Sequence, residues 1–156
     1  MSTTPAPERP LVVFAYDFDG TLAPGHMQNH AFIPEELGMD RAAFWAEVNA
    51  LAREQRGDEI LAYMHLMLAK ARERRLELSL ESWRARGASL RLFPGVEGWF
   101  ARQSARAEAL GLDLRHFIIS SGNRELIEGS PIAGWFERIY ASAFICLLYT
   151  SDAADE

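Results

Sequence analysis

Two aspartates one residue apart, Asp17 and Asp19, directly follow a short hydrophobic run. Side chains two residues apart on an extended backbone point to the same side, so we expect both carboxylates to lie together and Phe18 to point away. Carboxylates that close repel each other unless a cation or a shared proton compensates, and hard oxygen ligands at a phosphate site favour Mg²⁺. Gly20 lets the chain turn away closely, and Thr21 offers a hydroxyl and a backbone N–H to a phosphate oxygen. The group therefore predicts metal-assisted phosphate chemistry.

The run that precedes the pair, Leu11 to Tyr16, is short and rich in β-branched and aromatic residues, which is typical of a buried parallel strand. Ligands of parallel α/β sheets bind beyond the carboxyl ends of the strands, where the aspartates would lie. An acidic turn that only caps a strand would also contain Asp and Gly. Average residue usage nevertheless produces DxDGT by chance in only about one chain of this size in 500, so the pattern favours a functional site.

A second hydrophobic run, Leu114 to Ile119, ends at Ser120, Ser121 and Gly122. Backbone N–H groups of Ser121 and Gly122 at the start of a following helix would form an anion site, although Ser-Ser-Gly after a strand is also a common turn. A third run, Arg138 to Ala141, ends at Ser142. Helical stretches separate the runs, so the fold class predicted is α/β, with a Rossmann-like parallel sheet of about three strands.

Helical patterns fill the long segment between the first two strands. Asp40, Asp58 and Ser79 are expected to cap three successive helices, of which the first stops at Gly57 and the third runs to about Ser89. We expect these helices to form an all-α module, 23–91, inserted into a core made of 11–22 and 92–145. A further helix is predicted from Val96 to Leu110, ended by Gly111, and residues 1–10 are predicted to be a polar tail.

Helical spacing also predicts which residues of the module face inward. In the first helix these are Phe44, Val48, Leu51 and Ala52, and in the second they are Ile60, Leu61, Met64 and Leu68.

The hydrophobic strand followed by DxDGT resembles the first motif of the haloacid dehalogenase-like superfamily, and the chain is most similar to its phosphoserine phosphatase-like subgroup. The resemblance implies that Asp17 attacks phosphorus to form an aspartyl-phosphate, while Asp19 protonates the leaving alcohol and then activates water. It also implies that Mg²⁺ binds the Asp17 carboxylate, the Asp19 backbone carbonyl and a further aspartate downstream. The strand ending at Ser120 resembles the second motif, whose hydroxyl donates to the phosphoryl group. The helical module lies where the family places a cap domain.

Other parts of the family pattern are missing from the sequence. The third motif is a lysine and the fourth an acidic pair that completes the metal site, but no lysine follows Lys70. The last eleven residues, CLLYTSDAADE (146–156), resemble the translation of a transposase sequencing adaptor. We therefore expect the native sequence to depart from this one after about Ile145, and the chain to be an inactive N-terminal part of a longer enzyme. The resemblance also implies two further strands beyond the first, whose edge would be unpaired here.

Composition narrows the class of partner. A net charge of -6 does not favour nucleic acid or an anionic membrane. No hydrophobic run approaches the ~20 residues that cross a bilayer, and the first ten residues lack the features of a secretory signal. We expect a cytoplasmic protein that binds a small phosphorylated substrate. Its substrate and oligomeric state stay open.

Other functions fit parts of the pattern. A phosphomutase or a phosphonatase would use the same residues as a phosphatase, and a degenerate, non-catalytic phosphate-binding or signalling module is the alternative from another class. A receiver domain is disfavoured because its phosphoacceptor ends the third strand, and the run from Arg138 to Ala141 contains no aspartate. His26 and His30 are four residues apart, but Pro24 and Gly25 argue against a helix there. Contact with substrate from this loop is the better hypothesis than a shared metal.

Overall fold

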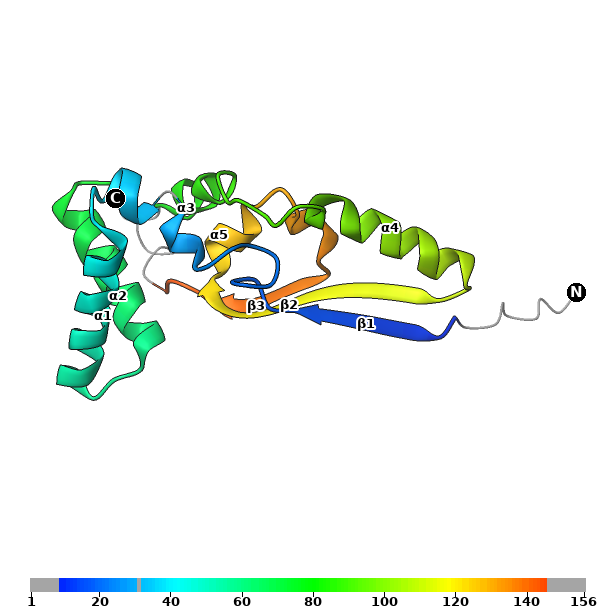
Figure 1. Cartoon of the computed structure of the whole chain (residues 1–156), viewed down its shortest axis with the longest axis horizontal. Helices are drawn as coiled ribbons and strands as arrows, with labels where there is room; N and C mark the ends of the chain where they lie inside the picture. The colour runs from blue at the N-terminus through cyan, green and yellow to red at the C-terminus, as the bar shows by residue number, and fades with distance from the viewer. Residues whose placement is uncertain (1–8, 31, 146–156) are drawn as a thin grey trace, which may run out of the picture.

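A three-stranded parallel sheet forms the centre of the molecule (Figure 1). The computed structural model describes residues 9–30 and 32–145. Strands β1 (Leu11–Tyr16), β2 (Asp113–Asn123) and β3 (Arg138–Ser142) lie in the order β1-β2-β3. The protein is therefore an α/β protein with a parallel sheet, as expected. The predicted tail at 146–156 lies outside the described residues.

Helices α4 (Val96–Ala109) and α5 (Arg124–Glu128) cover one face of this sheet, and α3 (Leu80–Gly87) lies beyond α5. A short 3-10 helix, η3 (Ala133–Trp135), precedes β3. Beneath α4, the ring of Tyr16 packs edge-on against that of Phe100, with centroids 5.6 Å apart. The Tyr16 hydroxyl accepts a hydrogen bond from Trp99 Nε1 and lies 3.0 Å from His116 Nδ1. These contacts tie α4 to the first two strands.

A helical hairpin lies beyond the carboxyl ends of the strands (Figure 1). Its helices are α1 (Arg41–Gln55) and α2 (Glu59–Glu73), and they begin where the caps were predicted. The Asp40 side chain accepts from Ala43 N, and that of Asp58 accepts from Ile60 N. Two short elements connect β1 to the hairpin: the 3-10 helix η1 (Met27–Asn29) and the π-helix η2 (Phe32–Glu36).

Helix α3 packs on α5 beside the sheet rather than mainly on the hairpin. The two backbones touch at Gly87 and Gly129, where an added Cβ would overlap the Leu126 and Arg84 carbonyl oxygens respectively. Trp83, fully buried on α3, packs between Phe32 and Phe144, with ring centroids at 4.8 and 5.0 Å. The described helices of the expected module therefore fall into two groups in space, a hairpin and a helix bound to the core.

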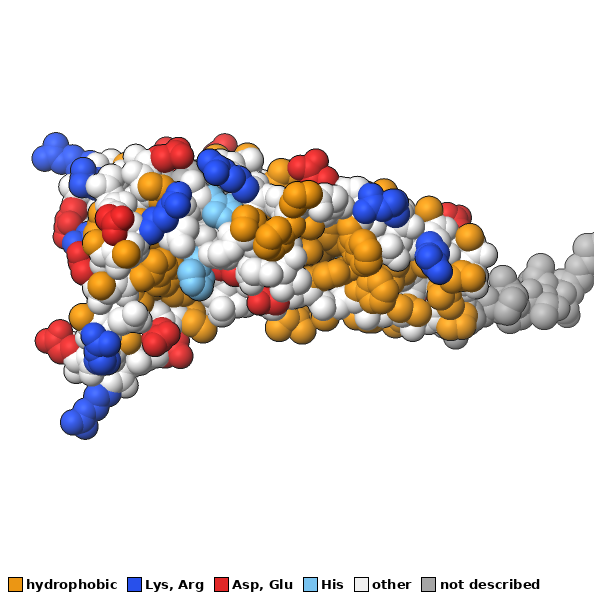
Figure 2. Space-filling view, in the orientation of Figure 1, with side chains coloured by type: hydrophobic (Ala, Val, Ile, Leu, Met, Phe, Trp, Pro, Cys, Tyr) orange, Lys and Arg blue, Asp and Glu red, His pale blue; other side chains and the backbone are white. Residues whose placement is uncertain are grey.

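The opposite face of the sheet is bare in the part of the chain that the structure describes. Four large hydrophobic side chains of the sheet are at least half exposed: Leu11, Val13, Ile119 and Tyr140. Parallel sheets normally bury both faces. Strand β1 also forms one edge of the sheet, so the predicted unpaired edge is confirmed for the described residues. Figure 2 shows hydrophobic side chains gathered over the region of the sheet and α4. No described helix combines the length and the apolar character needed to cross a membrane.

We expect the bare face and the free edge to make the chain self-associate, because exposed apolar surface and unpaired strand edges both promote it. Replacing Leu11 and Val13 together by lysine should shift the chain toward monomer in sedimentation velocity at equal protein concentration. The control is the double variant Leu61→Lys/Leu110→Lys, which adds the same charge at exposed positions on α2 and directly after α4. An equal shift in both variants would show that net charge, and not this face, controls association.

Candidate functional site

The loop that follows β1 holds the two aspartates at the carboxyl end of the strand. Asp17 is exposed, Phe18 is fully buried beneath it, and Asp19 is partly buried. The alternation expected from the sequence is therefore present. Gly20 has a φ of +76°, a conformation that L side chains rarely adopt, and its N–H donates to Ala23 O at 2.7 Å. Thr21 is exposed, but its backbone N–H donates to Phe18 O at 3.3 Å, so the N–H that was expected to bind a phosphate oxygen is already used within the loop.

The two carboxylates differ in their surroundings. Asp17 Oδ1 accepts from the N–H of Phe18 at 2.7 Å and stays open to solvent. Asp19 Oδ1 accepts from Met27 N at 3.0 Å, and burial raises the pKa of Asp19 to about 7. The Met27 hydrogen bond opposes this rise in pKa, whereas the negative charge of Asp17 adds to it. Asp19 can therefore carry a proton near neutral pH, as a general acid must, while its neighbour is exposed at the strand end.

The second predicted group lies inside β2 rather than after it. The strand continues through Ser120, Ser121 and Gly122 to Asn123, and its register against β3 shifts between Ile119 and Asn123. The Gly122 N–H donates to Ser120 Oγ at 3.1 Å. Helix α5 begins only at Arg124, so the helix start expected to supply N–H groups at Ser121 lies further along the chain.

Strand pairing brings the two groups to the same edge of the sheet. Tyr16 is opposite Ile118 in the parallel register, so Asp17 follows β1 at the level where β2 approaches Ser120. Adjacent strands lie about 4.8 Å apart. Met27, held by the Asp19 carboxylate, packs on Gly122 so closely that a Cβ there would collide with the methionine side chain. Residues a hundred positions apart therefore form one polar surface.

The helical hairpin reaches this surface through two aromatic side chains. The Tyr63 hydroxyl donates to Ser121 O at 2.7 Å, and burial together with the charge of Asp19 raises the pKa of Tyr63. Trp45 Nε1 donates to Asn29 Oδ1 at 2.9 Å. A cavity of about 130 Å³ lies between the strand ends and the hairpin, and it is bordered by Asp19, Ser121 and Gly122 on one side. Trp45 and Tyr63 border it on the other.

A layer of buried polar side chains supports the end of β2. Gln28 Nε2 donates to Asn123 Oδ1 at 2.8 Å, and both residues are almost completely buried. Glu125, 1% exposed, accepts from Phe144 N at 3.0 Å through one carboxylate oxygen. Its other oxygen has no hydrogen-bond partner among the described residues. Burial raises the pKa of Glu125, and the hydrogen bond from Phe144 N opposes this rise.

The raised pKa of Glu125 predicts a pH-dependent stability. A carboxyl whose pKa is higher in the folded than in the unfolded state stabilises the fold below its ordinary pKa, and that contribution is lost as pH rises through the raised value. We therefore expect Glu125→Gln to unfold at a higher temperature than wild type at about pH 8, and at a similar temperature at about pH 4, as measured by circular dichroism. The amide oxygen can still accept from Phe144 N. A variant less stable at both pH values would contradict the prediction.

The site contains some of the oxygen ligands that Mg²⁺ prefers, but they supply only part of its coordination. The Asp17 carboxylate and the Asp19 backbone carbonyl are hard oxygen donors at one strand end, which Mg²⁺ prefers. Within residues 9–30 and 32–145, no three acidic, histidine or cysteine side chains cluster as a metal site. Bound water or further ligands would have to fill the remaining positions of an octahedral shell.

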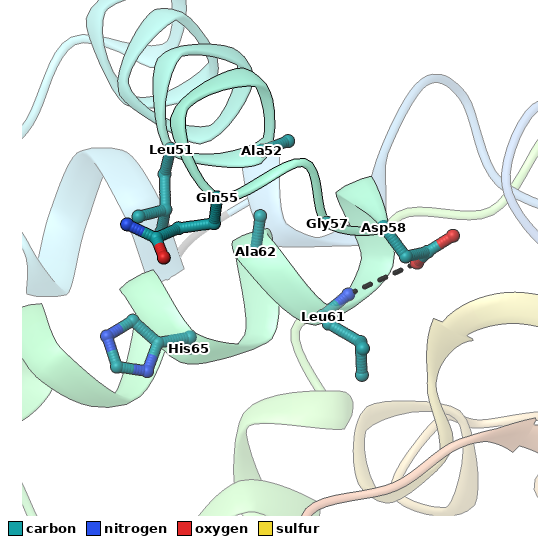
Figure 3. Close-up of a pocket in the computed structure, with 8 residues that line it drawn as sticks. All are labelled: Leu51, Ala52, Gln55, Gly57, Asp58, Leu61, Ala62 and His65. Carbon is teal, nitrogen blue, oxygen red and sulfur yellow. Dashed lines mark hydrogen bonds between the residues drawn. The ribbon is translucent and has the colours of Figure 1, made fainter.

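The two histidines that the sequence offered as further candidates, His26 and His30, have different surroundings in the structure. His26 is exposed, with Nδ1 3.8 Å from Asp19 Oδ2, so it lies beside the site as the loop hypothesis requires. His30 is buried, accepts from Arg91 N through Nδ1 and bonds Pro24 O through Nε2. Both of its ring nitrogens are therefore used within the fold. A larger hollow, between α1 and α2, is lined mainly by apolar side chains such as Leu51 and Leu61, with His65 at one side (Figure 3). None of the predicted site residues lines this hollow.

Sequence reasoning missed Tyr63, Trp45 and Gln28. The two aromatic residues read as ordinary core positions of amphipathic helices, although a buried tyrosine or tryptophan usually needs a partner for its polar atom. That requirement was the available signal, but it does not say which residue the partner is. Gln28 lies in a loop, and nothing in its sequence context marks it.

Comparison with known proteins identifies one similar sequence, and its name describes no activity. No protein-family model matches the chain. The chain is 34% identical over 145 residues to an uncharacterized protein of Borreliella burgdorferi, a match that covers 86% of this chain and 50% of that protein. The chain thus spans about half the length of the curated relative that it matches.

Proposed function

We propose that this chain carries the nucleophile and the phosphate-binding groups of a Mg²⁺-dependent phosphomonoester hydrolase of the haloacid dehalogenase-like superfamily. The observation that carries the proposal is the meeting of Asp17 and Asp19 with Ser120 at the carboxyl edge of a parallel sheet. This edge is where α/β proteins bind ligands, and Ser120 lies in the segment that the sequence pattern singled out by its order and spacing after Asp17 and Asp19.

In the proposed reaction, the exposed Asp17 carboxylate attacks phosphorus, and the bond from phosphorus to the leaving oxygen breaks. Asp19 donates its proton to that oxygen, so the leaving group departs as an alcohol. Asp19 then accepts a proton from the water that attacks the aspartyl-phosphate, which restores Asp17 and releases phosphate. The Ser120 and Thr21 hydroxyls donate to phosphoryl oxygens, and Gly20, Ser121 and Gly122 let the backbone approach them closely.

Mg²⁺, when bound, would reduce the repulsion between the nucleophile and the phosphate. Asp17 and the backbone of Asp19 are the residues proposed to hold it. Because no lysine follows Lys70 in the sequence, we expect the 156-residue chain by itself to be almost inactive. The cytoplasmic location and the small phosphorylated substrate belong to this same proposal.

The test starts from the source gene. Sequencing through the codon for Ile145 gives the natural reading frame, and the encoded protein is assayed with an aryl phosphate, with and without Mg²⁺, beside the 156-residue chain. We expect Mg²⁺-dependent turnover by the longer protein and little by the chain. A reading frame that stops after residue 156, together with phosphate binding but no turnover, would replace the proposal with the non-catalytic alternative. Robust turnover by the 156-residue chain would contradict its expected inactivity.

A further inference from the structure

The stretch of β2 that carries Ser120 is fixed only in part by the sheet. The regular pairing of β1 with β2 ends at the pair of Tyr16 with Ile118. On the other side, the register between β2 and β3 shifts between Ile119 and Asn123. Hydrogen bonds between strands normally hold a strand in place, and an irregular register disrupts them locally. Other contacts must therefore set the position of Ser120 relative to the loop after β1.

Two neighbouring contacts join that loop to the end of β2. Met27 packs directly on Gly122. The next residue of each segment extends the contact, because Gln28 Nε2 donates to Asn123 Oδ1 at 2.8 Å. Gln28 is 1% exposed and Asn123 is 0% exposed, so solvent does not compete for this hydrogen bond. These two side chains, called the amide pair below, connect segments that are 95 positions apart in the sequence.

Each side of the amide pair leads to a group of the proposed site. On the loop side, Met27 donates its backbone N–H to the Asp19 carboxylate at 3.0 Å. On the strand side, Gly122 donates its N–H to Ser120 Oγ at 3.1 Å. Because Ser120 Oγ accepts this bond, its own hydrogen is available for a phosphoryl oxygen. A displacement within the amide pair would therefore change the separation between the proton donor and the phosphate-binding hydroxyl.

The fold does not need an amide pair at this position for stability. Gln28 Oε1 and Asn123 Nδ2 have no hydrogen-bond partner among the described residues. Burying such atoms costs free energy, and replacing both members of a buried polar pair by apolar groups of the same shape is often neutral or stabilising. Apolar contacts are not directional, whereas a hydrogen bond weakens steeply as its angle changes. The amide pair thus fixes a geometry that an apolar pair would leave loose.

We infer that Gln28 and Asn123 are positioning residues of the proposed reaction. Their hydrogen bond sets how far the Asp19 carboxyl lies from the Ser120 hydroxyl. Neither amide touches the reacting atoms, and both act through the backbone N–H groups of the residues that precede them. The inference rests on the proposed function, because it assigns two further residues to the same reaction.

The test uses the protein encoded by the natural reading frame and its double variant Gln28→Met/Asn123→Leu, which replaces both amides by apolar side chains of similar size. We expect kcat for propyl phosphate to fall by at least about tenfold, because small displacements of catalytic groups are costly. The fall for phenyl phosphate should be smaller, since its leaving oxygen depends less on the proton of Asp19. The melting temperature, measured by circular dichroism, should equal or exceed that of wild type.

Ser130→Ala is the control. It removes another buried polar atom without a partner among the described residues, in the turn after α5, and it should leave kcat unchanged. The inference would be overturned by a double variant that keeps the wild-type kcat, that melts clearly below wild type, or that loses activity equally for both substrates. A loss of kcat in Ser130→Ala as large as in the double variant would also overturn it.

Absence of Mg²⁺-dependent turnover in the wild-type protein would instead overturn the proposed function, on which the inference rests. The two failures are therefore distinguishable.

Discussion

Replacing Asp17 with asparagine is expected to reduce Mg²⁺-dependent phosphate hydrolysis by about 10⁴-fold or more in the protein encoded by the natural reading frame. The amide has no negative oxygen to attack phosphorus, so no aspartyl-phosphate forms. The substitution should not disturb the fold, because Asp17 is exposed and an asparagine oxygen can still accept from the N–H of Phe18. Steady-state hydrolysis of an aryl phosphate measures the loss, and thermal unfolding measures the retained stability.

Asp19→Asn is the matched comparison, because it keeps the size of the side chain and an oxygen that can accept from Met27 N. It removes only the proton donor, and general acid–base catalysis typically contributes about 10²–10⁴-fold. The loss should therefore be largest for substrates with poor leaving groups and smaller for aryl phosphates, whose leaving oxygen needs less help. Equal losses for both kinds of substrate, or an active Asp17→Asn variant, would assign the two aspartates to other roles.

Gly129→Ala is expected to have the largest effect on stability, about 3 kcal/mol of lost unfolding free energy. The added methyl would overlap the carbonyl oxygen of Arg84, which is backbone and cannot rotate away. Relief requires α3 and α5 to separate, and this movement would open the packing of Trp83 against Phe144. Chemical denaturation monitored by tryptophan fluorescence measures the change.

Gly134→Ala is the control for that substitution. Nothing lies within 4 Å of a Cβ at Gly134, and no positive φ restricts the residue. Its effect should be within about 0.5 kcal/mol of zero, which separates the steric conflict at Gly129 from the general consequence of replacing a glycine. Similar effects of the two substitutions would contradict the close backbone contact between α3 and α5.

The local signals of the sequence were enough to predict most of the elements. The strand Leu11–Tyr16 has the predicted bounds, and Asp40, Asp58 and Ser79 cap α1, α2 and α3 as expected. These features depend on a few neighbouring residues. The expected burial of this strand is wrong, however, because every residue of β1 is exposed or only partly buried. A hydrophobic run predicts the strand itself, and a capping side chain bonds the backbone of its own helix, but burial depends on what packs against the strand.

The buried face of α2 was not predictable in the same way. Of the residues expected to face inward, Met64 is buried, Ile60 and Leu68 are partly buried, and Leu61 is 69% exposed. The side chains buried on this helix include Tyr63 and Met67 instead. Hydrophobic residues occur around most of the helix, so their spacing leaves its rotation undetermined. Packing against α1 and hydrogen bonding to Ser121 select the face that is buried.

For the candidate site, the types and spacing of Asp17, Asp19 and Ser120 already indicated phosphate chemistry, because few other reactions need those groups at the ends of two parallel strands. The tertiary structure supplied what depends on residues distant in the chain: the burial that raises the pKa of Asp19, the contact of Tyr63 with Ser121, and the cavity between the strand ends and the hairpin. It also showed that one face of the sheet is bare in the described part. Electrostatic and packing energies depend on distances in space, and a sequence specifies only the distances along the chain.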